Sequence, residues 1–475
     1  MQIFDTLSGG KKALPAPGGR PFRMFVCGPT VYGFSHIGHA RTYIFFDLVA
    51  RYLKNKGHQV QYLQNITDID DKIIERAHRE NTDHKNLAAH FTGEYKKDMK
   101  ALGIRSVITY APASKYIKEI IAQIKALLEK DFAYTTSSGI YFEVKKFSDY
   151  GKLSRQNLDG LRSGYRIEPD PEKKDALDFA IWKFKKYDYE PSWHSPWGEG
   201  RPGWHIEDTA ITEKHFGPQY NIHGGGIDLK FPHHEAEIAQ EESLSGKKPL
   251  ANIWMHTGFL LVGGEKMSKS LGNFITIRDF LEKYGANTLR ILVLQHHYRS
   301  PLDYGEEAAE QAQSAWGGLL QILAKLRMIK KQESSASPES QGLRGSKKQE
   351  LEEKIMEAEK RFHAAMQDDF NTPEAIAAIF AFISELQPRI YGLSKSEARE
   401  AEKFISATLK MLGFTIKLYK IPLKIQKIAK KRELCRGNKQ FKEADTLRKA
   451  IEALGYTVED TPLGPFVWLK HKNKT

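Results

Sequence analysis

The pattern of apolar and polar positions near the start of the chain predicts strands and helices in alternation. Residues 22–27 (FRMFVC) have the apolar character of a short buried strand, and a turn with glycine and proline follows. Apolar positions between 45 and 52 then recur at a helical period, and Gly57 is a suitable helix stop. A second strand is predicted at 58–67, and a charged helix begins at Lys72. This βαβ order is typical of a parallel nucleotide-binding sheet.

The pattern changes further along the chain. Between 104 and 200 the alternation is lost, with a helix predicted at 116–130, a strand at 139–144 and several Trp, Pro and Gly turns. Strand signals return at 203–264, whereas 278–297 and most residues from 306 onward have helical periods. The polar segment 334–346 is expected to be a linker. The end of the chain predicts two helices, 424–437 and 440–454, followed by two short strands within 456–469.

These patterns predict an α/β protein: a Rossmann-like parallel nucleotide-binding sheet with an insertion, followed by a helical bundle and a small C-terminal domain. With 475 residues the chain can form several separate cores. The expected division is a Rossmann-like catalytic domain from 1–103 and 201–250, a connective insertion at 104–200, a loop-bearing region at 251–305, a helical bundle at 306–416 and a basic C-terminal domain at 417–475.

Charge is distributed unevenly and suggests a polyanionic partner. The chain has 72 Lys and Arg against 59 Asp and Glu, and residues 417–475 contain 15 basic and 6 acidic residues, so this tail supplies +9 of the net +13. Such a field attracts nucleic acid, although a solvated basic face without a ligand is the simpler alternative.

Cysteine usage and hydropathy bear on location. The chain has only two cysteines, Cys27 and Cys435, which does not support a disulfide framework. The longest apolar run, 375–383, is too short to span a bilayer, and the first residues lack a signal-peptide pattern. We therefore expect a cytoplasmic protein with no membrane partner, in which Cys27 is free to act as a ligand.

Two short motifs suggest a nucleotide site. HIGH (residues 36–39) lies between the first strand and the first helix, where backbone N–H groups and the helix dipole favour phosphate. KMSKS (residues 266–270) follows two glycines, so its lysines are expected to lie on a loop that could close over a triphosphate. Alone, paired histidines at a helix start are local hydrogen bonders and a Lys/Ser-rich segment is a solvated turn. Their joint occurrence favours the nucleotide interpretation.

With these motifs the sequence resembles the class I aminoacyl-tRNA synthetases, in which HIGH and KMSKS are the signature motifs. The resemblance implies that an amino-acid carboxylate attacks the α-phosphorus of ATP, which is bound with Mg²⁺, and that the protein aligns groups and neutralises charge. It assigns the catalytic roles to His36, His39, Lys266 and Lys269.

Further stretches are similar to the cysteinyl-tRNA synthetases: CGPTVY (27–32), NITDIDDK (65–72), GRPGWHIE (200–207), HGGGID (223–228), FPHHEAEIAQ (231–240) and DDFNTPEA (368–375). This resemblance implies one Zn²⁺ that binds the substrate thiol, with L-cysteine, ATP and tRNA(Cys) as partners and anticodon reading by the tail. The residues that it assigns are Cys27, Asp208, His233 and Glu237 for the metal, Gly28, Thr67 and Trp204 for cysteine, and Gly225, Asp228 and Lys269 for ATP.

One position departs from the family pattern, because Asp208 stands where the family has a second cysteine. Asp is also a zinc ligand, and a carboxylate keeps the charge of a thiolate. The spacing of His233 and Glu237 places both on one helical face after Pro232. The alternatives are a helix cap for Asp208 and an exposed acid for Glu237, and His223 and His234 could be contacts to the site or packed histidines.

Two other functions fit parts of the sequence. A cysteine ligase of the mycothiol-pathway kind resembles the same core but lacks a long anticodon-binding tail, and a non-catalytic tRNA-binding relative does not need intact HIGH and KMSKS motifs. We expect a monomer.

Overall fold

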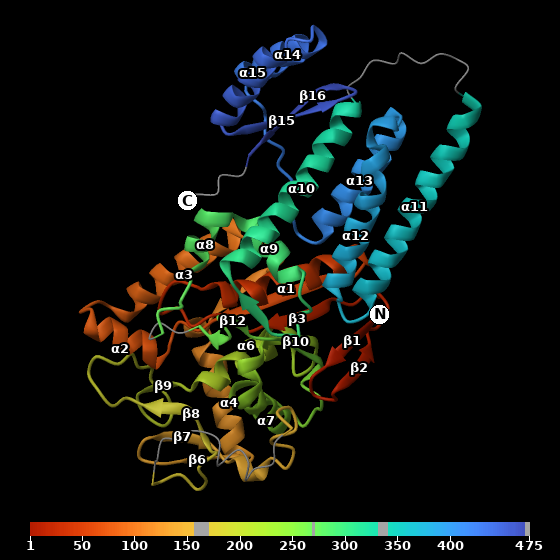
Figure 1. Cartoon of the computed structure of the whole chain (residues 1–475). Coiled ribbons are helices and arrows are strands. Elements are labelled where there is room, and N and C mark those ends of the chain that lie inside the picture. Colours follow the sequence, from red (N-terminus) through yellow and green to blue (C-terminus); the bar gives the residue numbers. More distant parts are fainter. Residues whose placement is uncertain (156–170, 268–270, 331–340, 471–475) are drawn as a thin grey trace. The chain divides into compact units, whose positions relative to one another are not determined.

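The computed structural model describes residues 1–155, 171–267, 271–330 and 341–470, with side chains from 348 onward in the last range. These residues form two compact units (Figure 1). The first unit contains Met1–Leu289, His296–Gly305 and Gln367–Phe370, and the second contains Arg290–Gln295, Glu306–Met366 and Asn371–Thr475.

A parallel sheet of five strands is the centre of the first unit. Its order is β11-β10-β3-β4-β5, with β3 at Phe22–Val26, β4 at Val60–Ile66, β5 at Thr109–Pro112, β10 at Tyr220–Gly226 and β11 at Ala251–Thr257. Every neighbouring pair is parallel. The predicted α/β fold with a parallel sheet is therefore confirmed. Two of its strands, β5 and β11, lie outside the segments 1–103 and 201–250 from which we expected the sheet.

The strand order reverses beside β3. From β3 the chain proceeds to β4 and β5 on one side, whereas β10 and β11 add on the other side. In open α/β sheets, ligands bind at the carboxyl ends of the strands at such a switch point. Cys27 directly follows β3, Thr67 directly follows β4, and Gly225 lies at the end of β10.

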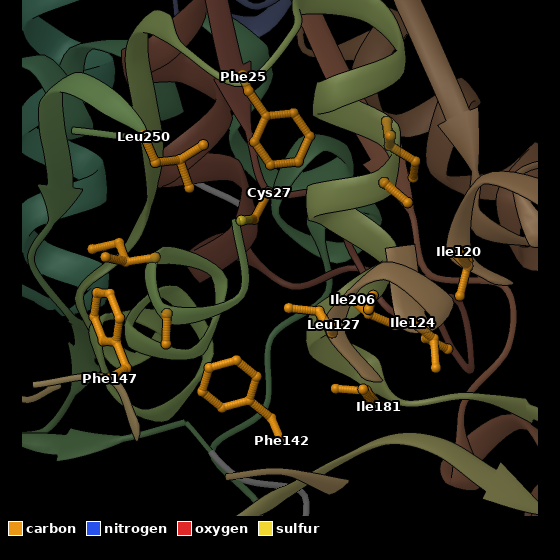
Figure 2. Packing of buried hydrophobic residues seen from close by; sticks show 14 of the residues in the cluster. Phe25, Cys27, Ile120, Ile124, Leu127, Phe142, Phe147, Ile181, Ile206 and Leu250 are labelled. Atoms are coloured by element: carbon orange, nitrogen blue, oxygen red, sulfur yellow. The ribbon is translucent and has the colours of Figure 1, made fainter. Parts of the chain in front are cut away.

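Helices bury apolar faces on this sheet. Helix α1, Ile37–Asn55, contacts β4, β10 and β11. Helix α6, Trp204–Phe216, contacts β4 and packs with α4, Ile117–Glu129, and α7, Glu235–Ser245. Figure 2 shows part of the resulting core, a cluster of buried residues to which Cys27, Phe25 and Leu250 belong. The thiol is therefore held in a dry interior.

The remaining elements of the first unit surround this centre. The insertion forms an antiparallel sheet of β6 (Ala133–Thr135), β7 (Gly139–Phe142), β8 (Phe179–Phe184) and β9 (Gly200–Pro202). The others are β1 (Gln2–Asp5), β2 (Gly10–Ala13), α2 (Asp71–Arg79), α3 (His84–Ala101), β12 (Leu260–Val262), β13 (Glu265–Lys266), α8 (Ile277–Tyr284) and β14 (Leu302–Tyr304). The helix expected at 278–297 is broken, because Gly285, at φ 82°, ends α8 before α9, Ala286–Leu294.

The second unit is mainly helical. It contains α10 (Glu306–Lys330), most of α11 (Gln341–Gln367), α12 (Thr372–Leu386), α13 (Lys395–Met411), α14 (Leu423–Gly437), α15 (Phe441–Ala453) and the hairpin of β15 (Tyr456–Thr461) and β16 (Gly464–Leu469). The two predicted terminal helices and strands are confirmed. Residues 341–346 belong to α11, which corrects the expected linker; residues 334–340 of that linker lie outside the described residues.

The C-terminal part of this unit has its own small core and an ionic link to α10. Ile425, Ala429, Ile451 and Val458 form the core. The Lys325 ammonium, on α10, lies 2.7 Å from a Glu459 carboxylate oxygen. Lys325 is buried whereas the Glu459 side chain is 48% exposed, so this pair is only partly shielded from water as it links the hairpin to the bundle.

Arg41 ties the helix that begins with the HIGH motif to a distant part of the first unit. Its buried guanidinium donates to the carbonyl oxygens of Phe259 and Ser300, and to that of Tyr298 at 3.3 Å. Burial lowers the pKa of Arg41 to about 10, so it remains a cation at neutral pH. The carbonyl oxygens of Phe259 and Tyr298 also accept from the backbone N–H groups of Leu302 and Gly258, so Arg41 supplies them with a second, charged donor.

Replacement of Arg41 by Met should lower the free energy of unfolding by about 3 kcal/mol, because the carbonyl groups of Phe259, Tyr298 and Ser300 lose a charged donor. Urea unfolding followed by fluorescence measures the change. Lys54→Met, at an exposed position of the same helix, is the control and should stay within about 0.5 kcal/mol of the parent. Equal effects of the two substitutions would show that the Arg41 contacts do not stabilise the unit.

Candidate functional site

The two HIGH histidines form the N-terminus of α1. The His36 ring nitrogen Nδ1 accepts a hydrogen bond from the Gly38 N–H at 3.1 Å, and His39 Nδ1 accepts from the His36 N–H at 3.3 Å. The two rings stack with their centroids 3.8 Å apart. This reciprocal arrangement is a capping box, so the local hydrogen-bonding interpretation of the motif is correct.

The same contacts define what the histidines can offer a ligand. Since each Nδ1 accepts a proton donor, the proton of each neutral ring lies on Nε2. Burial is the main reason that the pKa of His36 falls to about 3 and that of His39 to about 4. Both rings are therefore neutral hydrogen-bond donors at physiological pH, rather than positive charges.

The described part of the KMSKS segment lies beside this turn. The Lys266 ammonium is 3.5 Å from an Asp228 carboxylate oxygen, which brings a predicted catalytic residue and a predicted ATP-binding residue together. A Cβ at Gly38 would lie 2.8 Å from the His36 ring and 3.1 Å from the Met267 methyl group, so Gly38 makes room for these side chains. Lys269 lies outside the described residues.

The four predicted metal ligands converge at the carboxyl end of β3. One ligand atom from each of Cys27, Asp208, His233 and Glu237 lies within 4.8 Å of the others, and all four residues are buried. His233 Nε2 is 3.1 Å from Asp208 Oδ2 and 3.2 Å from Glu237 Oε1, and Cys27 Sγ is 3.5 Å from Asp208 Oδ2. A second group, Cys27, His223, His234 and Glu237, meets the same criterion.

Unpaired oxygen atoms in this cluster fit a cation. Asp208 Oδ1 and both Glu237 carboxylate oxygens are buried without a well-aligned hydrogen-bond partner among the described residues, although His233 Nε2 lies 3.2 Å from Glu237 Oε1. Such orphaned acceptors are costly unless a cation compensates them. Asp208 lies inside α6, four residues after its first residue, so it is not the helix cap of the alternative interpretation, and Glu237 is not an exposed acid. The sulfur, imidazole and carboxylate donors are those that zinc takes in proteins.

An outer layer of partners holds the ring nitrogens that face away from the cluster. His233 Nδ1 is 2.8 Å from His205 Nδ1, and His234 Nδ1 is 2.8 Å from His256 Nε2. His223 Nδ1 is 2.7 Å from the Tyr220 hydroxyl. Metal-binding histidines usually have such a second partner, which fixes the ring orientation.

Burial in this cluster disfavours the charged forms of its thiol, carboxyl and imidazole groups. Burial, followed by Glu237 and Asp208, raises the pKa of the Cys27 thiol well above its usual value. Burial also raises the pKa of Glu237 well above its usual value. The pKa values of His223 and His234 are lowered, mainly by burial, so these rings stay neutral and can donate a lone pair. A divalent cation would reverse the penalty on the thiolate and the carboxylates.

The predicted cysteine-binding residues are linked to the predicted metal ligands by stacking, by sequence and through Asn65. Trp204, 37% exposed, stacks on His233 with ring centroids 4.1 Å apart. The Gly28 N–H donates to Asn65 Oδ1 at 2.5 Å, and Asn65 Nδ2 donates to the buried Thr67 hydroxyl at 3.3 Å. A Cβ at Gly28 would lie 1.8 Å from the Asn65 carbonyl oxygen, so only glycine fits there.

Protein side chains lie close to Gly225, which is one of the predicted ATP-binding residues. A Cβ there would lie 2.9 Å from the His234 ring and 3.0 Å from Leu229.

Sequence reasoning did not single out His205, Glu207 or His256. The position of His256 near the end of β11 was the signal that could have found it, because strand ends meet at one edge of a parallel sheet.

Comparisons with known proteins agree with this arrangement. Residues 17–314 match the family described as tRNA synthetases class I (C) catalytic domain, and residues 361–417 match the DALR domain. The chain is 44% identical to the Cysteine--tRNA ligase of Thermococcus gammatolerans, over 99% of each chain. It is 40% identical to the Cysteine--tRNA ligase of Aquifex aeolicus, over 98% of each chain.

Solved structures with much lower sequence identity share the fold. The LeuRS in the ternary complex LeuRS-tRNA-LeuAMS of Agrobacterium radiobacter K84 has a TM-score of 0.64 at 12% identity, covering 84% of both chains. Methionyl-tRNA synthetase of Mycobacterium tuberculosis has a TM-score of 0.58 at 15% identity, covering 83% of this chain and 89% of the other. Among the described residues, no helix is long and apolar enough to cross a membrane. From the catalytic-domain match and the near-complete coverage by its relatives, the chain belongs to the Cysteine--tRNA ligase family of class I tRNA synthetases.

Proposed function

We propose that this protein activates L-cysteine with ATP, forms cysteinyl-adenylate with release of pyrophosphate, and transfers the cysteine to the 3′ end of tRNA(Cys). The observation that carries the proposal is the buried group Cys27, Asp208, His233 and Glu237, which lies at the switch point of the sheet of a Cysteine--tRNA ligase family member. A monomeric state and a cytoplasmic location stay predictions, which gel filtration and cell fractionation would test.

In adenylate formation, the role of the protein is mainly to position groups and to stabilise charge. The Nε2–H groups of His36 and His39 would donate to phosphate oxygens as negative charge develops. Lys266 would supply a cation near the same turn, where its ammonium lies 3.5 Å from an Asp228 carboxylate oxygen. We assign Lys269, together with Gly225 and Asp228, to ATP binding with Mg²⁺.

For amino-acid selection, we propose that Cys27, Asp208, His233 and Glu237 hold one Zn²⁺. Bound zinc would supply a soft Lewis acid that binds the substrate thiolate and distinguishes it from the hydroxyl of serine. A pocket shape alone discriminates close analogues by only about a hundredfold. Gly28, Thr67 and Trp204 would border the cysteine: Gly28 follows Cys27, Trp204 stacks on His233, and Asn65 links Gly28 to Thr67.

For tRNA recognition, we assign anticodon reading to the basic C-terminal residues 417–475. Helix α14 carries exposed lysines, among them Lys424, Lys427 and Lys430. Positive charge at this density lowers the free energy of a bound phosphate backbone through counterion release.

Pyrophosphate exchange with cysteine and with serine, before and after metal removal, tests the proposal as a whole. We expect exchange with cysteine that exceeds exchange with serine by several orders of magnitude, and we expect chelation to abolish it. Equal exchange with both amino acids would contradict the assigned substrate.

Removal of a HIGH donor should slow adenylate formation. His39→Ala should lower the rate by about a hundredfold, because one preorganised donor to the phosphates is lost. His39→Gln, which places an amide N–H near the position of Nε2, should retain more of the rate. Since the pKa of His39 is about 4, the rate should show no ionisation of this ring between pH 6 and 8. Stopped-flow measurement of adenylate formation checks both statements.

The purified protein should contain close to one zinc per chain, measured by mass spectrometry of metals. Asp208→Ala should lose metal and cysteine affinity together, whereas Asp208→Cys should retain both because charge and reach are similar. Asp70→Ala, which removes the N-cap of α2, is the control: it should cost about 1 kcal/mol of stability and leave the metal content unchanged. Retention of zinc by Asp208→Ala would instead assign the ion to Cys27, His223, His234 and Glu237.

The combined change Lys427→Gln and Lys430→Gln should weaken tRNA charging and leave cysteine-dependent pyrophosphate exchange intact. Each lost phosphate contact should reduce the slope of log affinity against log salt by about 1. A matched control is Lys403→Gln with Lys410→Gln, which removes the same charge from exposed positions of α13. An unchanged salt slope in the α14 variant would rule out phosphate contacts by these lysines.

A further inference from the structure

Phe259 is an exposed aromatic residue on a firmly held backbone. It lies between β11 and β12 and is 37% exposed. Its carbonyl oxygen accepts from the Leu302 N–H at 2.9 Å and from the Arg41 guanidinium. A Cβ on the preceding Gly258 would lie 2.6 Å from the Ser300 carbonyl oxygen, so the backbone is closely packed here. A single exposed ring needs no function, and the argument for one comes from its neighbour in space.

The strand register brings Lys266, the first lysine of the KMSKS segment, to this ring. Strands β12 and β13 are antiparallel, with Leu261 opposite Lys266. Phe259 precedes Leu261 by two residues, and side chains at this spacing along an extended backbone lie on one face. Diagonal neighbours on paired strands are within reach of aromatic and long side chains. Accordingly, the Lys266 ammonium lies 4.7 Å from the centroid of the Phe259 ring.

The hairpin that carries Lys266 is held at its turn as well. The Gly264 N–H, between β12 and β13, donates to the Asp303 carboxylate, whose two oxygens both lie 3.1 Å away. Asp303 belongs to β14, which pairs with β12. The backbone of Phe259 and the backbone of the hairpin are therefore fixed against the same strand, and the long side chain of Lys266 is the part that needs orientation.

The ring orients this ammonium without using its hydrogen-bond donors. The face of an aromatic ring attracts a cation through its quadrupole and accepts no strong hydrogen bond. The other contact of the ammonium, 3.5 Å from an Asp228 carboxylate oxygen, is an ion pair that competes directly with a phosphate. An ammonium has three N–H donors, so one that rests on a ring can still donate to phosphate oxygens.

We propose that Phe259 is a positioning residue that holds the Lys266 ammonium towards the phosphates of ATP through a cation–π contact. The assignment depends on the catalytic role of Lys266 and so rests on the proposed function. The Lys266 side chain is 62% exposed, so the contact belongs to the weaker, solvent-exposed kind. Its loss should therefore lower the rate of adenylate formation by about two- to fivefold.

Stepwise fluorination of the ring tests the contact with little change in shape. Mono-, di- and trifluorinated phenylalanine at position 259 of the full chain progressively weaken the negative face of the ring. The rate of adenylate formation, measured by stopped flow, should fall with each added fluorine and approach the rate of Phe259→Leu. A rate that is independent of fluorine content would overturn the assignment, because a ring that only fills space would not respond.

A double-mutant cycle tests whether the ring acts through the lysine. Phe259→Leu should slow adenylate formation in the parent and have no further effect in a Lys266→Met background. KM for cysteine and the zinc content should stay at the parent values. Tyr187→Leu is the control, since Tyr187 is an exposed ring of the insertion with the Lys186 ammonium 5.9 Å from its centroid, and this variant should retain the parent rate.

Additive effects of Phe259→Leu and Lys266→Met would separate the two residues and overturn the assignment. A raised KM for cysteine in Phe259→Leu would also overturn it, because the ring would then shape the amino-acid pocket. A parent protein that shows no exchange with cysteine would instead reject the proposed function, which is a distinguishable result.

Discussion

The burial of negatively charged ligands at the end of β3 is the constraint on which the site depends. Asp208 and Glu237 are 0% exposed and have oxygens without a well-aligned partner among the described residues, and the Cys27 thiol, whose pKa is raised, lies within 4.8 Å of a carboxylate oxygen of each. The effective penalty for burying one such ion is several kcal/mol. A fold with this arrangement is stable and useful only when a cation, or protonation, compensates the charge. The sheet and its helices supply the rigidity that holds the donors in place despite that penalty.

The buried histidines meet the same constraint by remaining neutral. His223 and His234 are kept neutral by burial, so their ring nitrogens can face the cluster without adding charge. Their second nitrogens are held by Tyr220 and His256, which come from β10 and β11. The orientation of the inner rings is therefore fixed by partners on two neighbouring parallel strands. The sheet that forms the fold therefore also positions these rings.

The sequence predicts local elements of this molecule better than their assembly. The βαβ order and the terminal hairpin follow from periodicity, whereas β5 and β11 joined the sheet from segments that we had assigned to other regions. Short strands next to turns have weak periodic signals, and only tertiary pairing decides their place. The meeting of Cys27 with Asp208 was expected from family resemblance and not from spacing. Glu207 was missed because one acid inside a helix looks like any solvated residue until its burial is known.

The HIGH turn shows why a structural and a functional interpretation of one motif need not compete. His36 and His39 close a capping box through Nδ1, as local hydrogen-bonding residues at a helix start do. That use of Nδ1 leaves the proton on Nε2, and burial keeps each ring neutral. Because the cap also fixes the rings against each other, both donors are oriented before any ligand arrives. A donor that needs no reorganisation is worth most in a transition state, so the contacts that stabilise the helix are the same contacts that would prepare it for phosphate.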